Sequence, residues 1–95
     1  MIGMLMQVCA AFGDDVTHCD VRVKYDTAYE SVKQCDQVAK TNVVKMVAGM
    51  EKNDPELVVF SYSGECFTRD ALKVKLNDLP EFMDAIGRTY QMTFY

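Results

Sequence analysis

The stretch "DDVTHCDVRV", residues 14–23, holds the only histidine of the chain, His18, directly before Cys19. An imidazole beside a thiol is a combination that can form a base and nucleophile pair or bind a metal ion. Here Val21 and Val23 alternate with polar residues, which is the pattern of a half-buried β-strand. Adjacent side chains of a strand point to opposite faces. We therefore expect His18 and Cys19 not to act together.

Cys9 and Cys19 lie on the two arms of a predicted β-hairpin and could form a second kind of site. A three-residue turn at residues 13–15 would place the two cysteines opposite each other. A two-residue turn at residues 13–14 instead pairs Val8 with Cys19 and gathers the apolar residues of both arms on one face. We expect the second register, in which Cys9 and Cys19 make no contact.

The other two cysteines show no metal-binding spacing. Cys35 falls within a helical apolar stripe, where a thiol behaves as a small hydrophobe, and Cys66 is the best candidate for an exposed thiol. The chain has no Cys-x-x-Cys pair, no glycine-rich phosphate loop and no Ser-His-Asp set. We expect no catalytic residue, no metal and no cofactor, and we interpret the four cysteines as reduced thiols of a cytoplasmic protein.

Charge and length limit the classes of partner. The 95 residues carry a net charge of −4, and the 14 acidic and 10 basic residues are interspersed, without a basic patch that would neutralise phosphates. The N-terminal run "MIGMLMQVCAAFG" is too short to span a bilayer and lacks the basic start of a signal peptide. We expect a small acidic protein without nucleic-acid or membrane partners.

A long amphipathic helix is predicted for the middle of the chain. Thr27 and Glu30 have the spacing of a capping box, and the helix is expected to end near Glu51. Its apolar stripe has spacings of four and three residues and comprises Ala28, Val32, Cys35, Ala39, Val43, Met46 and Met50. Such a helix is longer than a typical strand, so we expect it either to overhang the sheet or to break near "KTN".

The second half of the chain is predicted to alternate strands with one short helix. "LVVFSYS" is a strand, Ser63 and Gly64 suggest a two-residue turn, and the alternation in "ALKVKL" predicts a further strand. A short helix is expected to begin at Asp78 and to stop at Gly87. "TYQMTFY" is aromatic and β-branched, which favours a final strand.

These elements predict a single α+β domain over residues 1–95. We expect two layers, with a mixed sheet of four to five strands and one long and one short helix on one face. The order is β-grasp-like, ββαββαβ, and a ferredoxin-like fold with an extra N-terminal strand is the alternative. The order resembles the ubiquitin-like fold, and Val58 to Tyr95 resembles the second half of PB1-type interaction domains in outline. This resemblance is one of topology alone, and no family is assigned.

The predicted function is non-enzymatic protein binding, as a small interaction or adaptor domain that also self-associates as a homodimer through the long helix or an edge strand. The expected interface residues are apolar and lie on these two elements: Val43, Met46, Val47, Met50, Tyr90, Met92 and Phe94. Replacing Met46 and Met50 with lysine is expected to abolish association. The alternative is an acidic accessory or inhibitor protein that binds a host enzyme or a nucleic-acid-binding protein electrostatically.

Overall fold

The computed structural model of the chain describes residues 2–12 and 16–95. Their elements form the order ββαβαβ, which has one strand fewer than the β-grasp-like and ferredoxin-like orders expected from the sequence. In chain order the elements are β1 (Ile2–Phe12), β2 (Val16–Lys24), α1 (Val32–Asn53), β3 (Val58–Thr68), α2 (Arg69–Ala85) and β4 (Thr89–Phe94).

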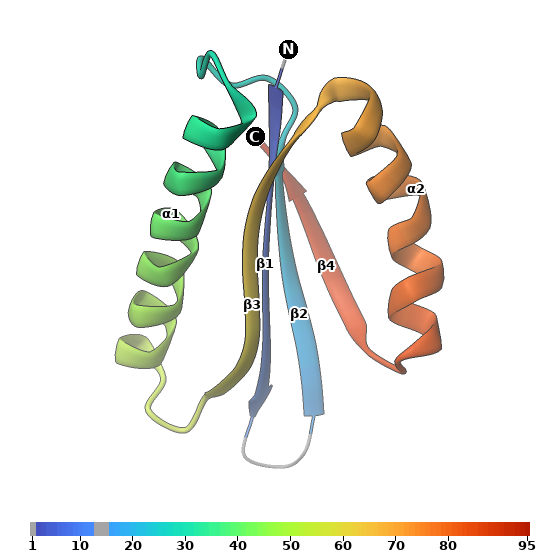
Figure 1. Cartoon of the computed structure of the whole chain (residues 1–95). Coiled ribbons are helices and arrows are strands. Elements are labelled where there is room, and N and C mark those ends of the chain that lie inside the picture. Colours follow the sequence, from blue (N-terminus) through green and yellow to red (C-terminus); the bar gives the residue numbers. More distant parts are fainter. Residues whose placement is uncertain (1, 13–15) are drawn as a thin grey trace.

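The strands form one mixed sheet in the order β3-β1-β2-β4. β1 is antiparallel to both β2 and β3, whereas β4 runs parallel to β2. This confirms the predicted α+β domain with a four-stranded mixed sheet and two helices. The helices are placed differently from the prediction that both cover one face: α1 and α2 lie on opposite sides of the sheet (Figure 1).

Each helix packs on its own side of the sheet because the strands carry apolar residues on both faces. On the α1 side, Met4 of β1 and Cys66 of β3 pack with Cys35 and Ala39. The second cluster comprises Cys9, Cys19, Val21, Val23, Leu72, Leu79 and Met83, which lie between the sheet and α2. Strands that are apolar on both faces must be covered on both faces, and this is why the single-face arrangement expected from the sequence does not form.

The register between β1 and β2 differs from the expected one. Cys9 lies opposite Cys19, and Val8 lies opposite Asp20. The neighbouring register would be favoured only if a single face of the hairpin were buried. In the structure α2 buries the face that carries Cys9 and Cys19, and α1 covers Met4 on the other face. The turn residues 13–14, on which the expected register depended, lie outside the described residues.

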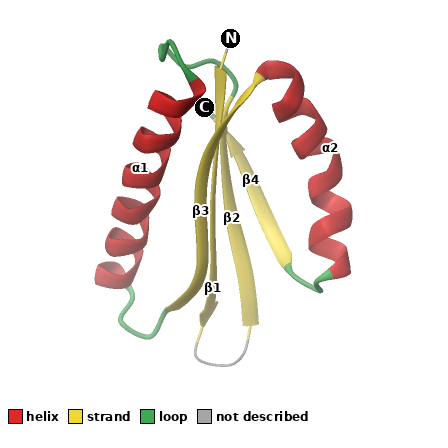
Figure 2. Ribbon diagram, in the orientation of Figure 1, coloured by secondary structure: helices red, strands yellow, loops and turns green. Residues whose placement is uncertain are grey.

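Helix α1 begins later than expected, at Val32, because Ser31 and not Thr27 caps it. The Ser31 hydroxyl accepts a hydrogen bond from the backbone N–H of Gln34, while the Thr27 hydroxyl donates to the carbonyl of Ile2. The helix is continuous through "KTN" to Asn53. Its 22 residues span about 33 Å, and the 11-residue strands β1 and β3 span about 36 Å. The helix therefore has no need to overhang the sheet (Figure 2).

β3 is one continuous strand, and the predicted turn at Ser63 and Gly64 does not occur. Gly64 is buried because α1 crosses closely above it: a Cβ atom added to Gly64 would lie 2.5 Å from the carbonyl oxygen of Ala39. Gly64 therefore permits close helix packing, and its interpretation as a turn residue is wrong.

Helix α2 starts at Arg69, nine residues before the expected start at Asp78, and the segment "ALKVKL" is helical. The Thr68 hydroxyl accepts a hydrogen bond from the N–H of Ala71 and caps the helix. The residues on the buried side follow the helical spacings of four, three and four, and are Leu72, Leu76, Leu79 and Met83. Val74, which fitted the strand alternation, is 60% exposed. The expected stop is confirmed, since Gly87 follows the helix with φ of 65°.

Candidate functional site

The four cysteines form two disulfides, which corrects both the absence of a Cys9–Cys19 contact and the exposed thiol expected at Cys66. Cys9 bonds to Cys19 across β1 and β2, and Cys35 of α1 bonds to Cys66 of β3. All four residues are buried. The described part of the chain contains no free cysteine. The cysteines therefore join secondary-structure elements to one another and leave no thiol to act as a nucleophile or metal ligand.

His18 lies on the face opposite to Cys19, as the strand alternation predicts. Its Nδ1 atom is 3.1 Å from the hydroxyl oxygen of Thr89, and that hydroxyl donates to the carbonyl of Thr17 at 3.1 Å. Since the hydroxyl proton is used by Thr17, the Thr89 oxygen can accept from the Nδ1–H of His18. These hydrogen bonds link β2 to β4, so the His18 side chain has a structural role between the two strands.

Asp20 does not join His18 in an acid–base pair. Its carboxylate instead faces Arg22 at 3.4 Å, and both side chains are partly exposed. Within residues 2–12 and 16–95, no group of three or more His, Cys, Asp or Glu side chains could hold a metal ion. In the same residues, neither helix has the length and hydropathy needed to cross a membrane.

The expected interface residues of α1 lie along the C-terminal half of the helix. Val43 is buried against the sheet and is 2% exposed. Met46, Val47 and Met50 are half-buried. Val44, in the same half of the helix, is 52% exposed.

The expected interface residues of β4 lie on the other side of the sheet and at the other end of the strand order. Tyr90 and Met92 pack against the buried cluster beneath α2. Phe94 is exposed, and its ring stacks on Tyr25 with centroids 5.6 Å apart. The structure therefore does not bring the two expected groups together into one surface.

The most extended open feature of the described residues is the outer edge of β3. Because β3 is the first strand in the order, only β1 pairs with it. The strand has 11 residues, "VVFSYSGECFT", of which only Glu65 carries a charge. Val58, Phe60 and Tyr62 are all exposed. A long, apolar and nearly uncharged edge is a template for pairing with a further strand.

Alternate residues of β3 direct their backbone groups away from β1. The Cα atoms of Cys9 and Cys19 are 4.0 Å apart, which is typical of a non-hydrogen-bonded antiparallel pair. Cys9 therefore bonds through its backbone to β3, opposite Ser61. By alternation, the backbone N–H and C=O groups of Tyr62, Gly64 and Cys66 point outward.

The side chain of Asp36 confirms this phase and closes one end of the edge. Its Oδ1 atom accepts a hydrogen bond from the backbone N–H of Cys66. This N–H therefore points away from β1 and is not bonded to it. The carboxylate thus blocks strand pairing at Cys66. Among the other outward positions, Tyr62 is exposed, whereas Gly64 is buried beneath α1.

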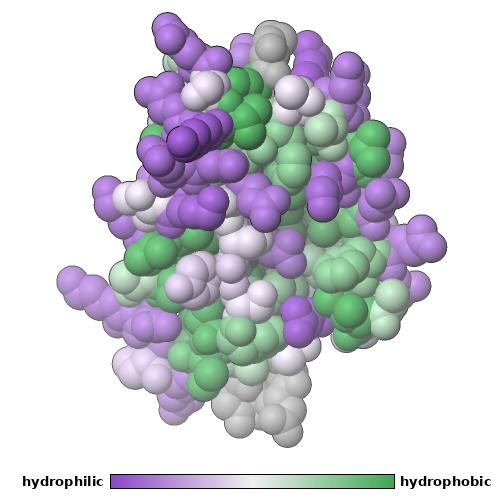
Figure 3. Space-filling view, viewed as in Figure 1, coloured by the Kyte–Doolittle hydropathy of each residue, from purple (hydrophilic) through white to green (hydrophobic). Residues whose placement is uncertain are grey.

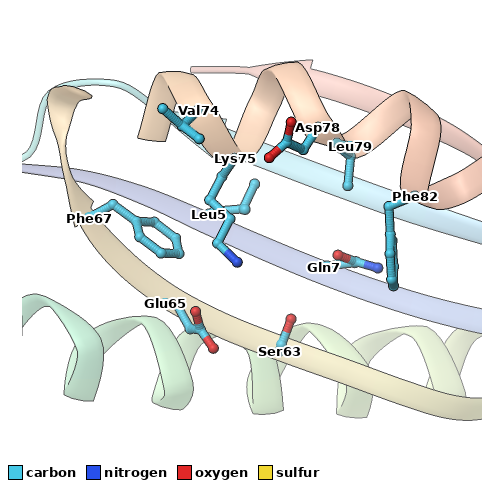
Figure 4. Close-up of a pocket in the computed structure, with 10 residues that line it drawn as sticks. All are labelled: Leu5, Gln7, Ser63, Glu65, Phe67, Val74, Lys75, Asp78, Leu79 and Phe82. Atoms are coloured by element: carbon cyan, nitrogen blue, oxygen red, sulfur yellow. The ribbon is translucent and has the colours of Figure 1, made fainter. Parts of the chain in front are cut away.

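A groove follows β3 on the α2 side of the sheet (Figure 4). Its volume is about 330 Å³, and its walls come from β1, β3 and α2. Leu5 and Phe67 form its apolar floor, while Val74 and Phe82 of α2 are 60% and 56% exposed above it. Lys75 extends from α2 toward the sheet with its amino group 5.8 Å from the centre of the Phe67 ring.

A second groove follows the same strand on the α1 side. It also has a volume of about 330 Å³, and it lies between α1 and Gly64 of β3. Lys40 and Val44 form its helical wall, and Tyr62 lies at its end. Ser63 and Glu65 line both grooves. The open edge is thus flanked on each face by a groove that can receive alternate side chains of an added strand.

Figure 3 shows the side of the molecule on which β3 passes in front of β1. Apolar residues gather over the lower half of this side, and hydrophilic residues cover the upper part of α1. The turn expected at Ser63 and Gly64 divides β3, so this surface does not follow from the predicted elements. The sequence feature that indicates this surface is the 11-residue segment of β3, in which only one residue is charged.

Comparisons with known proteins add no relative. No protein-family model matches the chain, and neither a curated protein nor a solved structure matches it.

Proposed function

We propose that the chain is a non-enzymatic protein-interaction domain that binds by adding a partner strand to the outer edge of β3. The observation that carries this proposal is the outward-pointing backbone of the exposed residue Tyr62, with a groove on each face of the strand. Main-chain hydrogen bonds supply affinity in this mode, and pockets for alternate side chains supply specificity. The proposal retains the edge-strand binding expected from the sequence and moves it from β4 to β3.

The geometry around β3 favours a protein strand over a small molecule as the occupant. The two grooves share Ser63 and Glu65 and extend on opposite faces of one strand, so only an extended chain lying along β3 reaches both. The side chains that converge on the groove between β3 and α2 are of mixed charge, with Glu65, Lys75 and Asp78 around an apolar floor. This composition suits peptide side chains better than one charged ligand.

The Tyr62→Pro variant tests the proposal because proline removes an outward N–H that the sheet itself does not use. Wild type and Tyr62→Pro are immobilised and exposed to extract of the source cells, and the captured proteins are identified by mass spectrometry. We expect the partner to be lost with Tyr62→Pro and kept with the control variant Tyr62→Thr, which retains the N–H and suits a strand. Equal capture by a folded Tyr62→Pro protein would refute binding through this edge.

The cysteine pairing removes the basis for the cytoplasmic location expected from the sequence. That expectation depended on reduced thiols, whereas all four cysteines are paired in disulfides. Disulfides persist mainly in oxidising compartments. The pairing therefore favours an oxidising compartment as the place where the domain works.

A further inference from the structure

We infer that the surface between α1 and β2 binds a small amphipathic anion, in which a carboxylate is attached to an aliphatic chain. This site lies away from the outer edge of β3 and does not depend on the proposed function. A cavity of about 470 Å³ lies there, which is within the usual size range of small-molecule sites. Its described lining combines Met4 and Met6 of β1 with the cations Arg22 and Lys24 of β2.

Strand alternation brings the two cations to this side of the sheet. Val23 is buried in the cluster beneath α2, so its neighbours Arg22 and Lys24 point to the α1 side. The register pairs Arg22 with Met6 and Lys24 with Met4. Helix α1 packs on β1 and β3, so it covers Met4 but leaves Lys24 exposed. Each cation therefore lies beside a methionine of the neighbouring strand.

The side chains of this site are positively charged, although the whole chain carries a net charge of −4. Among the described residues that line the cavity there is no aspartate or glutamate. The Oδ2 atom of Asp20 lies 3.4 Å from Nη2 of Arg22, and Lys24 has no ion pair in the described part of the chain. The three side chains together thus keep one positive charge. A ligand with a single negative charge complements it, which favours a carboxylate over a dianionic phosphate.

Polar groups on the α1 wall offer further hydrogen-bond donors. Asn42 of α1 has an amide, and Tyr29, in the segment before the helix, has a hydroxyl. That segment is fixed to the sheet, since the Thr27 hydroxyl donates to the carbonyl of Ile2 at 2.9 Å. The donors of the α1 wall and the cations of β2 therefore border the same cavity from two elements.

The floor of the cavity is apolar and elongated. Met4 is buried and Met6 is half-buried, and Tyr29 belongs to the same apolar cluster. Methionine side chains are flexible, so they adapt to the shape of an aliphatic chain. The helical wall extends from the start of α1 at Val32 to Asn42, a rise of about 15 Å. An aliphatic chain of medium length that ends in a carboxylate matches this floor and its charged border.

NMR of the methionine methyl groups tests the site, with decanoate as the probe. Met4 and Met6 lie in the floor, whereas Met83 is buried beneath α2 on the other side of the sheet. We expect decanoate, kept below the concentration at which it forms micelles, to shift the methyl signals of Met4 and Met6 and not that of Met83. Decanol lacks the charge and acetate lacks the chain, so each should bind at least roughly tenfold more weakly. Equal binding of decanol or of acetate would overturn the inference.

The variant Lys24→Gln removes the unpaired cation, and Lys73→Gln is its matched control. Lys73 is exposed on α2, so both variants change the net charge equally but only one changes the site. We expect Lys24→Gln to weaken decanoate binding about threefold to tenfold and Lys73→Gln to leave it unchanged. Because Lys24 is exposed, its replacement leaves the fold intact, which circular dichroism verifies. Equal binding by wild type and Lys24→Gln, equal weakening by both variants, or unshifted signals of Met4 and Met6 would overturn the site and leave the β3 proposal untouched.

Discussion

Two glycines illustrate how the same residue type has opposite roles at different positions. Gly64 lies under the backbone of α1, and an added Cβ atom would be 2.5 Å from the oxygen of Ala39. At Gly49, on the exposed side of α1, an added Cβ atom would meet nothing within 4 Å. Gly64 is therefore required for the packing of α1 on β3, whereas Gly49 only lowers the stability of α1.

We predict that Gly64→Ala lowers the free energy of unfolding by about 2 kcal/mol, because the backbone of α1 must move away from β3. Gly49→Ala should raise it by about 0.5 to 1 kcal/mol, since alanine has the higher helix propensity. Urea unfolding followed by circular dichroism measures both. A Gly64→Ala variant as stable as wild type would show that α1 does not lie over this residue.

The face on which a single side chain lies is easier to predict from the sequence than the residue that it contacts. The separation of His18 from Cys19 follows from strand alternation alone and is confirmed by their opposite faces. The pairing of Cys9 with Cys19 depends on a one-residue difference in register. That difference depends on which face a helix covers, which is long-range information that local spacing does not contain.

At the scale of elements, helix α2 shows why alternation can mislead. In "ALKVKL" the apolar residues Leu72, Val74 and Leu76 fit a strand, but Leu72 and Leu76 also fit the helical stripe that continues to Leu79. Six residues are too few to separate the two periods. The apolar pattern that continues to Met83, together with the N-cap at Thr68, indicates a helix.

We predict that Thr68→Ala lowers the free energy of unfolding by about 1 kcal/mol, because the N–H of Ala71 loses its acceptor. Asp78→Ala serves as the matched control, since Asp78 lies within α2 and caps nothing in the structure. It should leave the urea midpoint unchanged or slightly higher. A loss with Asp78→Ala and none with Thr68→Ala would place the start of the helix at the later position.

At the scale of the whole molecule, the strand order leaves one edge of β3 without a neighbouring strand. Helix α1 covers β1 and β3 on one side, and α2 packs on the other side against a cluster drawn from β1, β2, β3 and β4. A groove remains between α2 and β3, and the outer edge of β3 keeps the exposed residue Tyr62. The class of fold and the mixed sheet could be predicted from the order of elements. The open edge could not, because it depends on the strand order.

Hydrogen exchange of the backbone amides tests the central claim, the use of the β3 edge, most directly. Exchange is measured by NMR on the wild-type protein alone and with the protein that is captured in a Tyr62-dependent manner. The amide of Tyr62 points outward and the residue is exposed, so we expect this amide to exchange fast in the free protein and to become protected in the complex. The amides of β4 should not change. Protection that appears in β4 or along α1, while Tyr62 continues to exchange fast in the complex, would contradict the account.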